Sequence, residues 1–224
     1  MYIVLIVLVL GASWLVQTRL KSKFRKYSQT PISSNLTGRE IAEKMLADHG
    51  IYDVKVISVN GQLTDHYNPI KKTVNLSEVV YNHRNAAAAA VAAHEVGHAV
   101  QHARSYSWLH MRSRLVPVVS ASSRYMQWIL LVGILTIQVF PYLLLAGIVM
   151  FALTTLFSFI TLPVEFDASN RALLWMEERN IARQDELEDS KDALKWAAMT
   201  YVLAAVSSLA TLLYYISIFM GRRN

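Results

Sequence analysis

The sequence of 224 residues is 54% hydrophobic and only 17% charged, which is more apolar than soluble domains usually are. It contains no cysteine, which excludes disulfides, cysteine-bound zinc, iron–sulfur clusters and a thiol nucleophile. The formal net charge of +6 does not favour nucleic acid as a partner, because basic residues in a membrane protein usually flank its spans.

The first apolar run covers residues 2–16 and is followed at once by a basic cluster of Arg19, Lys21, Lys23, Arg25 and Lys26. It predicts a transmembrane helix over residues 1–18. A cleaved signal peptide is the alternative, although such a peptide carries its positive charge before the apolar run. Because basic residues concentrate on the cytoplasmic side, the segment that follows is expected there, with Arg222 and Arg223 on the opposite side.

Residues 27–114 have the composition of a soluble domain, which we expect to be catalytic. Thr37 and Glu40 have the spacing of a capping box, and Gly50 should end the helix that they open. The alternating segment 53–59 predicts a strand, and the following Asn60-Gly61 favours a hairpin with a partner strand at 63–67. A third short strand at 72–76 and an alanine-rich helix over about 84–104 complete the domain.

A second long apolar region covers residues 125–161 and is interrupted near its middle at Gln138 and Pro141. It is too long for one span, so it predicts a transmembrane helical hairpin over 117–162. A polar helical segment over 163–195 and a closing span over 197–220 follow. We therefore expect a mainly α, multi-pass integral protein of the cell membrane with a small β-sheet and about four transmembrane helices.

The alanine-rich helix carries His94-Glu95-Val96-Gly97-His98, a pattern that would arise in about one of a hundred shuffled sequences of this composition. Histidines at positions i and i+4 lie on one helix face, so His94 and His98 can bind one zinc ion. Glu95 is placed to take a proton from a zinc-bound water. Gly97 costs about 1 kcal/mol relative to alanine in a helix, which a close approach of another backbone or of a substrate would explain.

A third ligand is needed, and the next carboxylates in the chain are Glu165 and Asp167. We expect Glu165, because two histidines and one glutamate form a known catalytic zinc set. Asp167 would face another way on a helix. The two crossings of the predicted hairpin return the chain to the side of the histidines, so Glu165 can reach them.

Three segments together resemble the YugP-like membrane zinc metallopeptidases, and the resemblance covers nearly the whole chain. They are His94-Glu95-Val96-Gly97-His98-Ala99-Val100-Gln101-His102, Asp65-His66-Tyr67-Asn68-Pro69 and Leu162-Pro163-Val164-Glu165-Phe166-Asp167-Ala168-Ser169. The family is similar in layout to the HtpX-type membrane proteases. The resemblance implies a zincin-like catalytic domain of the glutamate-ligand (gluzincin) type, with His94, His98 and Glu165 as ligands and Glu95 as the catalytic residue.

In HtpX-type enzymes an aspartate lies four residues after the ligating glutamate, whereas Ser169 occupies that position here. Asp167 or Ser169 is therefore expected to hold a ligating histidine in place. His102, one turn beyond His98, is interpreted as a neighbour that supports the ligands rather than as a fourth ligand. Three residues are candidate donors of a hydrogen bond to the developing oxyanion, namely His66, Tyr67 and Arg171.

These observations predict a membrane-bound endopeptidase with one catalytic Zn²⁺ and with protein or peptide substrates, membrane proteins among them. An extended substrate could add to an exposed sheet edge within 63–76. One alternative is an intramembrane protease of the site-2 type, with the motif helix inside the bilayer. The other is a non-catalytic membrane scaffold stabilised by zinc, but such a site has no use for Glu95. The sequence leaves the oligomeric state open.

Overall fold

The computed structural model describes residues 2–221. Its helices are α1 (Tyr2–Tyr27), α2 (Gly38–Asp48), α3 (Glu78–Asn82), α4 (Ala86–Ala103), α5 (Ser107–Leu135), α6 (Pro141–Glu178) and α7 (Gln184–Gly221). Its strands are β1 (Lys55–Val59), β2 (His66–Asn68) and β3 (Thr73–Ser77). The chain forms two compact units, one of residues 16–109 and 164–199 and the other of the remaining described residues. We call the first the mixed α/β unit and the second the helical unit.

The three strands of the mixed α/β unit form one sheet in the order β1-β3-β2. β1 runs parallel to β3, with Lys55 opposite Thr73, and β2 runs antiparallel to β3, with His66 opposite Asn75. The predicted hairpin between 53–59 and 63–67 is therefore wrong, whereas the third strand at 72–76 is confirmed.

The error has a physical cause in the burial of β3. All five residues of β3 are buried, so the strand gains most from the central position, with one neighbour on each side. The turn that closes the real hairpin follows β2, where the Asn68 side chain accepts hydrogen bonds from the amides of Ile70 and Lys71 at 3.0 and 2.9 Å. Such a side-chain turn stabilises a reversal of the chain without an Asn-Gly pair.

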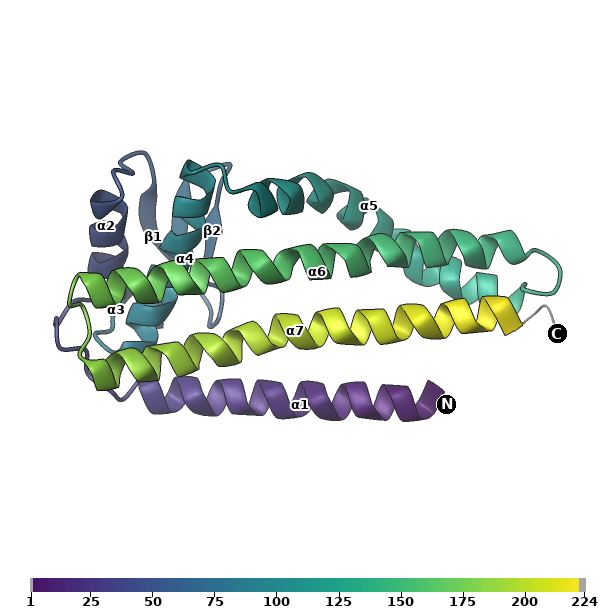
Figure 1. The fold of residues 1–224 in the computed structure, drawn as a ribbon, viewed down its shortest axis with the longest axis horizontal. Helices are drawn as coiled ribbons and strands as arrows, with labels where there is room; N and C mark the ends of the chain where they lie inside the picture. Colours follow the sequence, from purple (N-terminus) through teal and green to yellow (C-terminus); the bar gives the residue numbers. More distant parts are fainter. Residues whose placement is uncertain (1, 222–224) are drawn as a thin grey trace. The chain divides into compact units, whose positions relative to one another are not determined.

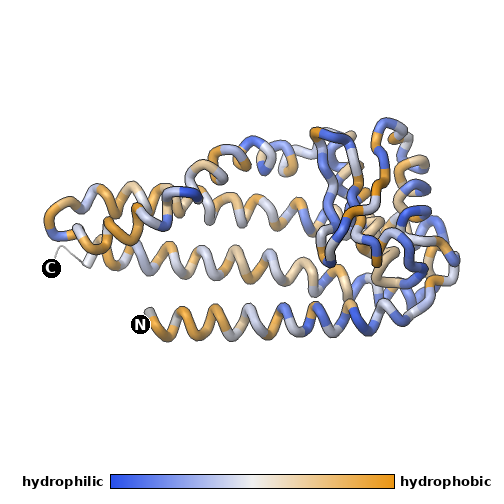
Figure 2. Tube along the Cα trace, turned by 180° about the vertical axis from the view of Figure 1, so that it is seen from behind, coloured by the Kyte–Doolittle hydropathy of each residue, from blue (hydrophilic) through white to orange (hydrophobic). Residues whose placement is uncertain are grey.

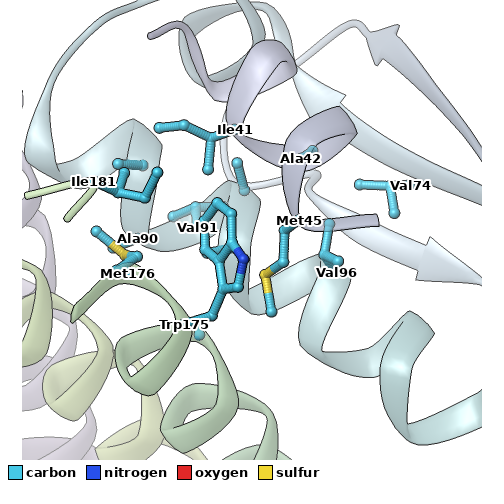
Figure 3. Close-up of a cluster of buried hydrophobic side chains, with 14 of the residues drawn as sticks. Ile41, Ala42, Met45, Val74, Ala90, Val91, Val96, Trp175, Met176 and Ile181 are labelled. Atoms are coloured by element: carbon cyan, nitrogen blue, oxygen red, sulfur yellow. The ribbon is translucent and has the colours of Figure 1, made fainter. Parts of the chain in front are cut away.

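Helix α4 crosses the centre of the mixed α/β unit, with α2 and the strands around it (Figure 1). All of its alanines except Ala103 are buried, and their small side chains allow the neighbouring elements to pack closely. Figure 3 shows the resulting core, where Ile41 and Met45 of α2 meet Ala90 and Val91 of α4. Trp175 of α6 enters the same cluster, and its indole N–H donates to Asp48 at 3.0 Å.

The capping box at the start of α2 is confirmed. The Thr37 side chain accepts a hydrogen bond from the Glu40 amide, and the Glu40 carboxylate accepts one from the Thr37 amide. Asn85 caps α4 in a similar way by accepting from the Ala88 amide at 2.8 Å. These caps fix where the two helices begin, because each satisfies an amide that has no partner within its helix.

Three helices of the described chain, α5, α6 and α7, are long and apolar enough to cross a membrane. The fourth span, expected over residues 1–18, is not among them and stays a prediction. Figure 2 shows the apolar residues along the segments of these helices in the helical unit. There Gly133 allows close packing of α5 on α6, since a Cβ at this position would lie 2.7 Å from the backbone of Leu144.

Helix α6 continues without a break through Pro163 to Glu178, and α7 continues from the polar segment into the last apolar run. The chain reverses between them at residues 179–183, where Asn180 has a φ of 51°. The polar helical segment expected over 163–195 is thus divided between the end of α6 and the beginning of α7. Glu165 lies two residues after Pro163, on the part of α6 that belongs to the mixed α/β unit.

Candidate metal centre

The two histidines of the motif lie one turn apart on α4 and face the same side of the helix. His94 is partly exposed, whereas Glu95 and His98 are each 8% exposed. The ring centroids of His94 and His98 are 4.8 Å apart, with the planes nearly perpendicular. Both imidazoles can therefore present a nitrogen to one point in space.

Helix α6 brings Glu165 to that point because α4 carries a glycine where the two helices meet. A Cβ added to Gly97 would lie 2.6 Å from the backbone oxygen of Ala168, closer than real Cβ atoms come to other atoms. The expected reason for Gly97 is therefore found in the backbone of α6. Glu165 and Ala168 lie on neighbouring turns of α6, so this contact sets the distance of the glutamate from the histidines.

The donor atoms of three side chains converge at this place. Glu165 Oε2 lies 3.4 Å from His94 Nε2 and 3.6 Å from His98 Nε2. Zinc binds nitrogen and oxygen at about 2.0–2.2 Å, so two ligands of a tetrahedral ion lie about 3.3–3.6 Å apart. The observed separations fit this value and exceed those of good N–H···O hydrogen bonds. His94, His98 and Glu165 therefore form a possible metal site.

The electrostatics of the three side chains agree with a site for a cation. Burial opposes the charged form of Glu165, but the nearby imidazoles of His94 and His98 outweigh it and lower the pKa of this carboxyl group. Burial also opposes protonation of His98, yet the carboxylates of Glu165 and Glu95 raise its pKa above the ordinary value. Negative charge in a buried place thus attracts a positive charge, which a proton or a metal ion can supply.

The other nitrogen of each imidazole has a partner of its own. His94 Nδ1 lies 3.1 Å from the Ser169 hydroxyl, and His98 Nδ1 lies 3.0 Å from Gln101 Oε1. A hydrogen bond at Nδ1 holds the ring in orientation and leaves Nε2 for a metal. The Ser169 hydroxyl therefore contacts one imidazole of the site and the Gln101 amide contacts the other.

The remaining residues predicted for the site lie in two groups. Asp167 contacts neither histidine but accepts from the Gln101 amide at 2.8 Å and from Arg171 Nε at 2.6 Å. Tyr67 and His102 contact each other, with the phenol oxygen 3.0 Å from His102 Nδ1. This second contact joins β2 to α4.

His66 is exposed on β2, and its Nδ1 lies 2.8 Å from the backbone oxygen of Thr64. The structure thus brings together His94, His98, Glu165 and Ser169 as expected. It pairs Arg171 with a carboxylate and Tyr67 with a histidine, and neither contact assigns an oxyanion donor.

Gln101 is the residue that the sequence analysis missed. Its side chain is completely buried between α4 and α6, although glutamine is usually exposed. The available signal was its position three residues after His98, on the same face of an alanine-rich helix. A polar residue on that face is, like His102, a candidate to contact a ligating histidine.

Comparison with known proteins shows to which class this arrangement belongs. Residues 2–220 match the model of a family described as "Putative neutral zinc metallopeptidase", and the chain belongs to this family. A relative in Bacillus subtilis (strain 168), described as "Putative membrane protease YugP", is 42% identical over 224 residues, which cover 100% of this chain and 99% of that protein. No solved structure matches. The resemblance inferred from the three sequence segments is confirmed.

Proposed function

We propose that this protein is a membrane-bound, zinc-dependent endopeptidase. The observation that carries the proposal is the convergence of Glu165 on His94 and His98, directly beside the buried Glu95. Two histidines and a glutamate are a ligand set of catalytic zinc, which leaves a fourth position for water. A structural zinc site usually has four protein ligands. Within residues 2–221, the group that could hold an ion consists of these three residues.

Each residue of the site would then have its own chemical role. His94 and His98 would bind zinc through Nε2 and Glu165 through a carboxylate oxygen. Zinc, when bound, lowers the pKa of water to about 7 and polarises the scissile carbonyl. The Glu95 carboxylate takes the proton of the attacking water and then passes it to the nitrogen of the leaving amine.

The substrate chain would lie along β2. The sheet order leaves β2 with an edge on which an extended peptide can form main-chain hydrogen bonds. The contact between Tyr67 and His102 connects this strand to the helix that carries the ligands. A peptide on β2 would therefore reach the zinc site through residues that are already in contact with α4.

We place the reaction in the mixed α/β unit and not in an apolar bundle. There α4 packs against α2 and the sheet. The sequence of this unit contains most of the charged residues of the chain. This packing supports an ordinary peptidase over an intramembrane protease of the site-2 type. A zinc-stabilised scaffold without activity is the other alternative, and Glu95 separates it from an enzyme.

The test compares the native chain with Glu95→Gln and with the matched control Glu188→Gln, whose side chain is exposed on α7. All three are purified in detergent, analysed for bound metal and assayed on casein and on a peptide library. We expect equal zinc contents and a loss of cleavage by about 10²–10⁴-fold in Glu95→Gln alone, the contribution of a general base. If the native chain holds zinc but cleaves no substrate that Glu95→Gln does not also cleave, the result would favour the zinc-stabilised scaffold.

A further inference from the structure

Gln101 is fully buried. It contacts His98, a proposed ligand, and also α6, the helix that carries Glu165. Its Nε2 donates to the backbone oxygen of Val164 and to Asp167 Oδ2, each at 2.8 Å. Its Oε1 lies 3.0 Å from His98 Nδ1. One amide thus contacts His98 and also the residue directly before Glu165.

These contacts determine the orientation of the Gln101 amide and which ring nitrogen of His98 carries the proton. An amide nitrogen has two N–H donors, and both are used on acceptors that have no proton to give. The amide oxygen must therefore face His98, which means that His98 Nδ1 carries the hydrogen and donates it. In the neutral imidazole the lone pair then lies on Nε2, the atom that is 3.6 Å from Glu165 Oε2.

Asp167 and Arg171 hold this amide in its orientation. Arg171 donates to Asp167 from Nε at 2.6 Å and from Nη2 at 3.3 Å, a two-point contact that fixes the carboxylate plane. The guanidinium also lies over the ring of Tyr106, 5.7 Å from its centroid. A rotated amide would bring its oxygen against the oxygens of Asp167 and Val164, so this arrangement excludes the reversed orientation.

The other histidine has no such constraint. His94 Nδ1 contacts a hydroxyl, and the Ser169 hydroxyl can donate or accept. Its ring can therefore take either tautomer without losing the hydrogen bond. The two imidazoles of the centre are thus held by groups of different chemistry, and only His98 has its tautomer fixed by its neighbours.

We propose that Gln101 is a positioning residue that selects the metal-binding tautomer of His98 and couples it to α6. Asp167 and Arg171 act through this amide and do not contact the substrate. The inference rests on the proposed zinc site and adds to it the residues that prepare the site before zinc arrives.

The experiment uses the full-length protein in detergent and measures zinc affinity by chelator competition, independently of peptidase activity. Gln101→Leu keeps the approximate size of the side chain and removes its three hydrogen bonds. We expect a loss of zinc affinity of about 10–100-fold, typical when a partner of a ligating histidine is removed. Asp167→Leu should weaken binding less, and the double variant should bind zinc as well as Gln101→Leu does. Gln29→Leu, at an exposed position, is the matched control.

A second measurement separates positioning from folding. ¹⁵N NMR of the metal-free protein, at a pH high enough for His98 to be neutral, should show its proton on Nδ1 in the native chain and a mixture of tautomers in Gln101→Leu. Equal zinc affinity and an unchanged tautomer would overturn the inference, as would additive losses in the double variant. If Gln101→Leu does not fold, Asp167→Leu alone must still shift the tautomer. A native chain without zinc affinity would instead contradict the proposed function itself.

Discussion

A missing methyl group at Gly97 determines how closely the two ligand-bearing helices approach. The histidine ligands could be predicted from the sequence because their spacing depends only on helix geometry. The reason for Gly97 could be stated only in general terms, since the contact with Ala168 joins residues far apart in the chain. Gln101 was missed for the same reason, because its partners Val164 and Asp167 lie on another helix.

Gly97→Ala tests this contact. Alanine favours a helix over glycine by about 1 kcal/mol, but its Cβ would meet the Ala168 oxygen at 2.6 Å and push α4 and α6 apart. Overpacking of this kind typically costs about 1–3 kcal/mol, so we expect a lower melting temperature and a lower zinc content. Gly11→Ala is the matched control on α1, where a Cβ meets nothing within 4 Å. A variant at Gly97 that melts higher and keeps its zinc would contradict the role of this contact.

Among the elements, those with local signals were predicted well. The predicted capping box of Thr37 and Glu40 is present at the start of α2. The alanine-rich run forms α4 within a few residues of the expected bounds. Strand pairing was predicted wrongly because it depends on which strand gains most from burial, and this is a property of the whole unit. The reversal between α6 and α7 was also missed, since residues 179–183 contain neither glycine nor proline.

That reversal is held by Glu186, which is 1% exposed and accepts from the amides of Ser33 and Arg183 at 2.9 and 3.0 Å. Burial raises the pKa of this carboxyl group, but the amide hydrogen bonds outweigh it and bring the pKa below the 4.5 of an ordinary glutamate. A lowered folded-state pKa means that the stabilisation is complete above about pH 4.5. It is lost as the pH falls through the folded-state value.

We therefore expect Glu186→Gln to melt below the native chain at pH 7. The difference should shrink as the pH falls below about 4.5, because protonation removes the same charge from the native side chain. Thermal unfolding of the metal-free protein between pH 7 and pH 3 measures this, with Glu188→Gln as the control. If the difference in melting temperature stays constant over this pH range, the charge of Glu186 contributes nothing to stability.

For the whole molecule, composition and the lengths of the apolar runs predicted a membrane protein. Three helices of sufficient length and apolarity agree with this, and the relative described as "Putative membrane protease YugP" matches over 99% of its length. The direction of insertion depends on the basic cluster after the first apolar run, from which we propose a cytosolic mixed α/β unit.

The absence of cysteine makes the direction measurable, because a single introduced thiol can be labelled without background. Ile70, between β2 and β3, is 94% exposed, and Val139, between α5 and α6, is 89% exposed. With an impermeant thiol reagent on intact cells, we expect Val139→Cys to react at once and Ile70→Cys only after permeabilisation. The reverse pattern would place the mixed α/β unit outside. Labelling of both from one side would show that α5 and α6 do not cross.

The position of Glu165 late in the chain also has a consequence for biosynthesis. A ribosome makes the helix with His94 and His98 first, and it completes the ligand set only after it has translated the whole of the predicted hairpin. A nascent chain that stops before Glu165 carries two ligands and the general base, but not the three-residue set. Under the proposed function, hydrolytic competence would therefore arise only once the second apolar segment of the hairpin has been synthesised. Translation order would protect the insertion machinery from a protease that is still being made.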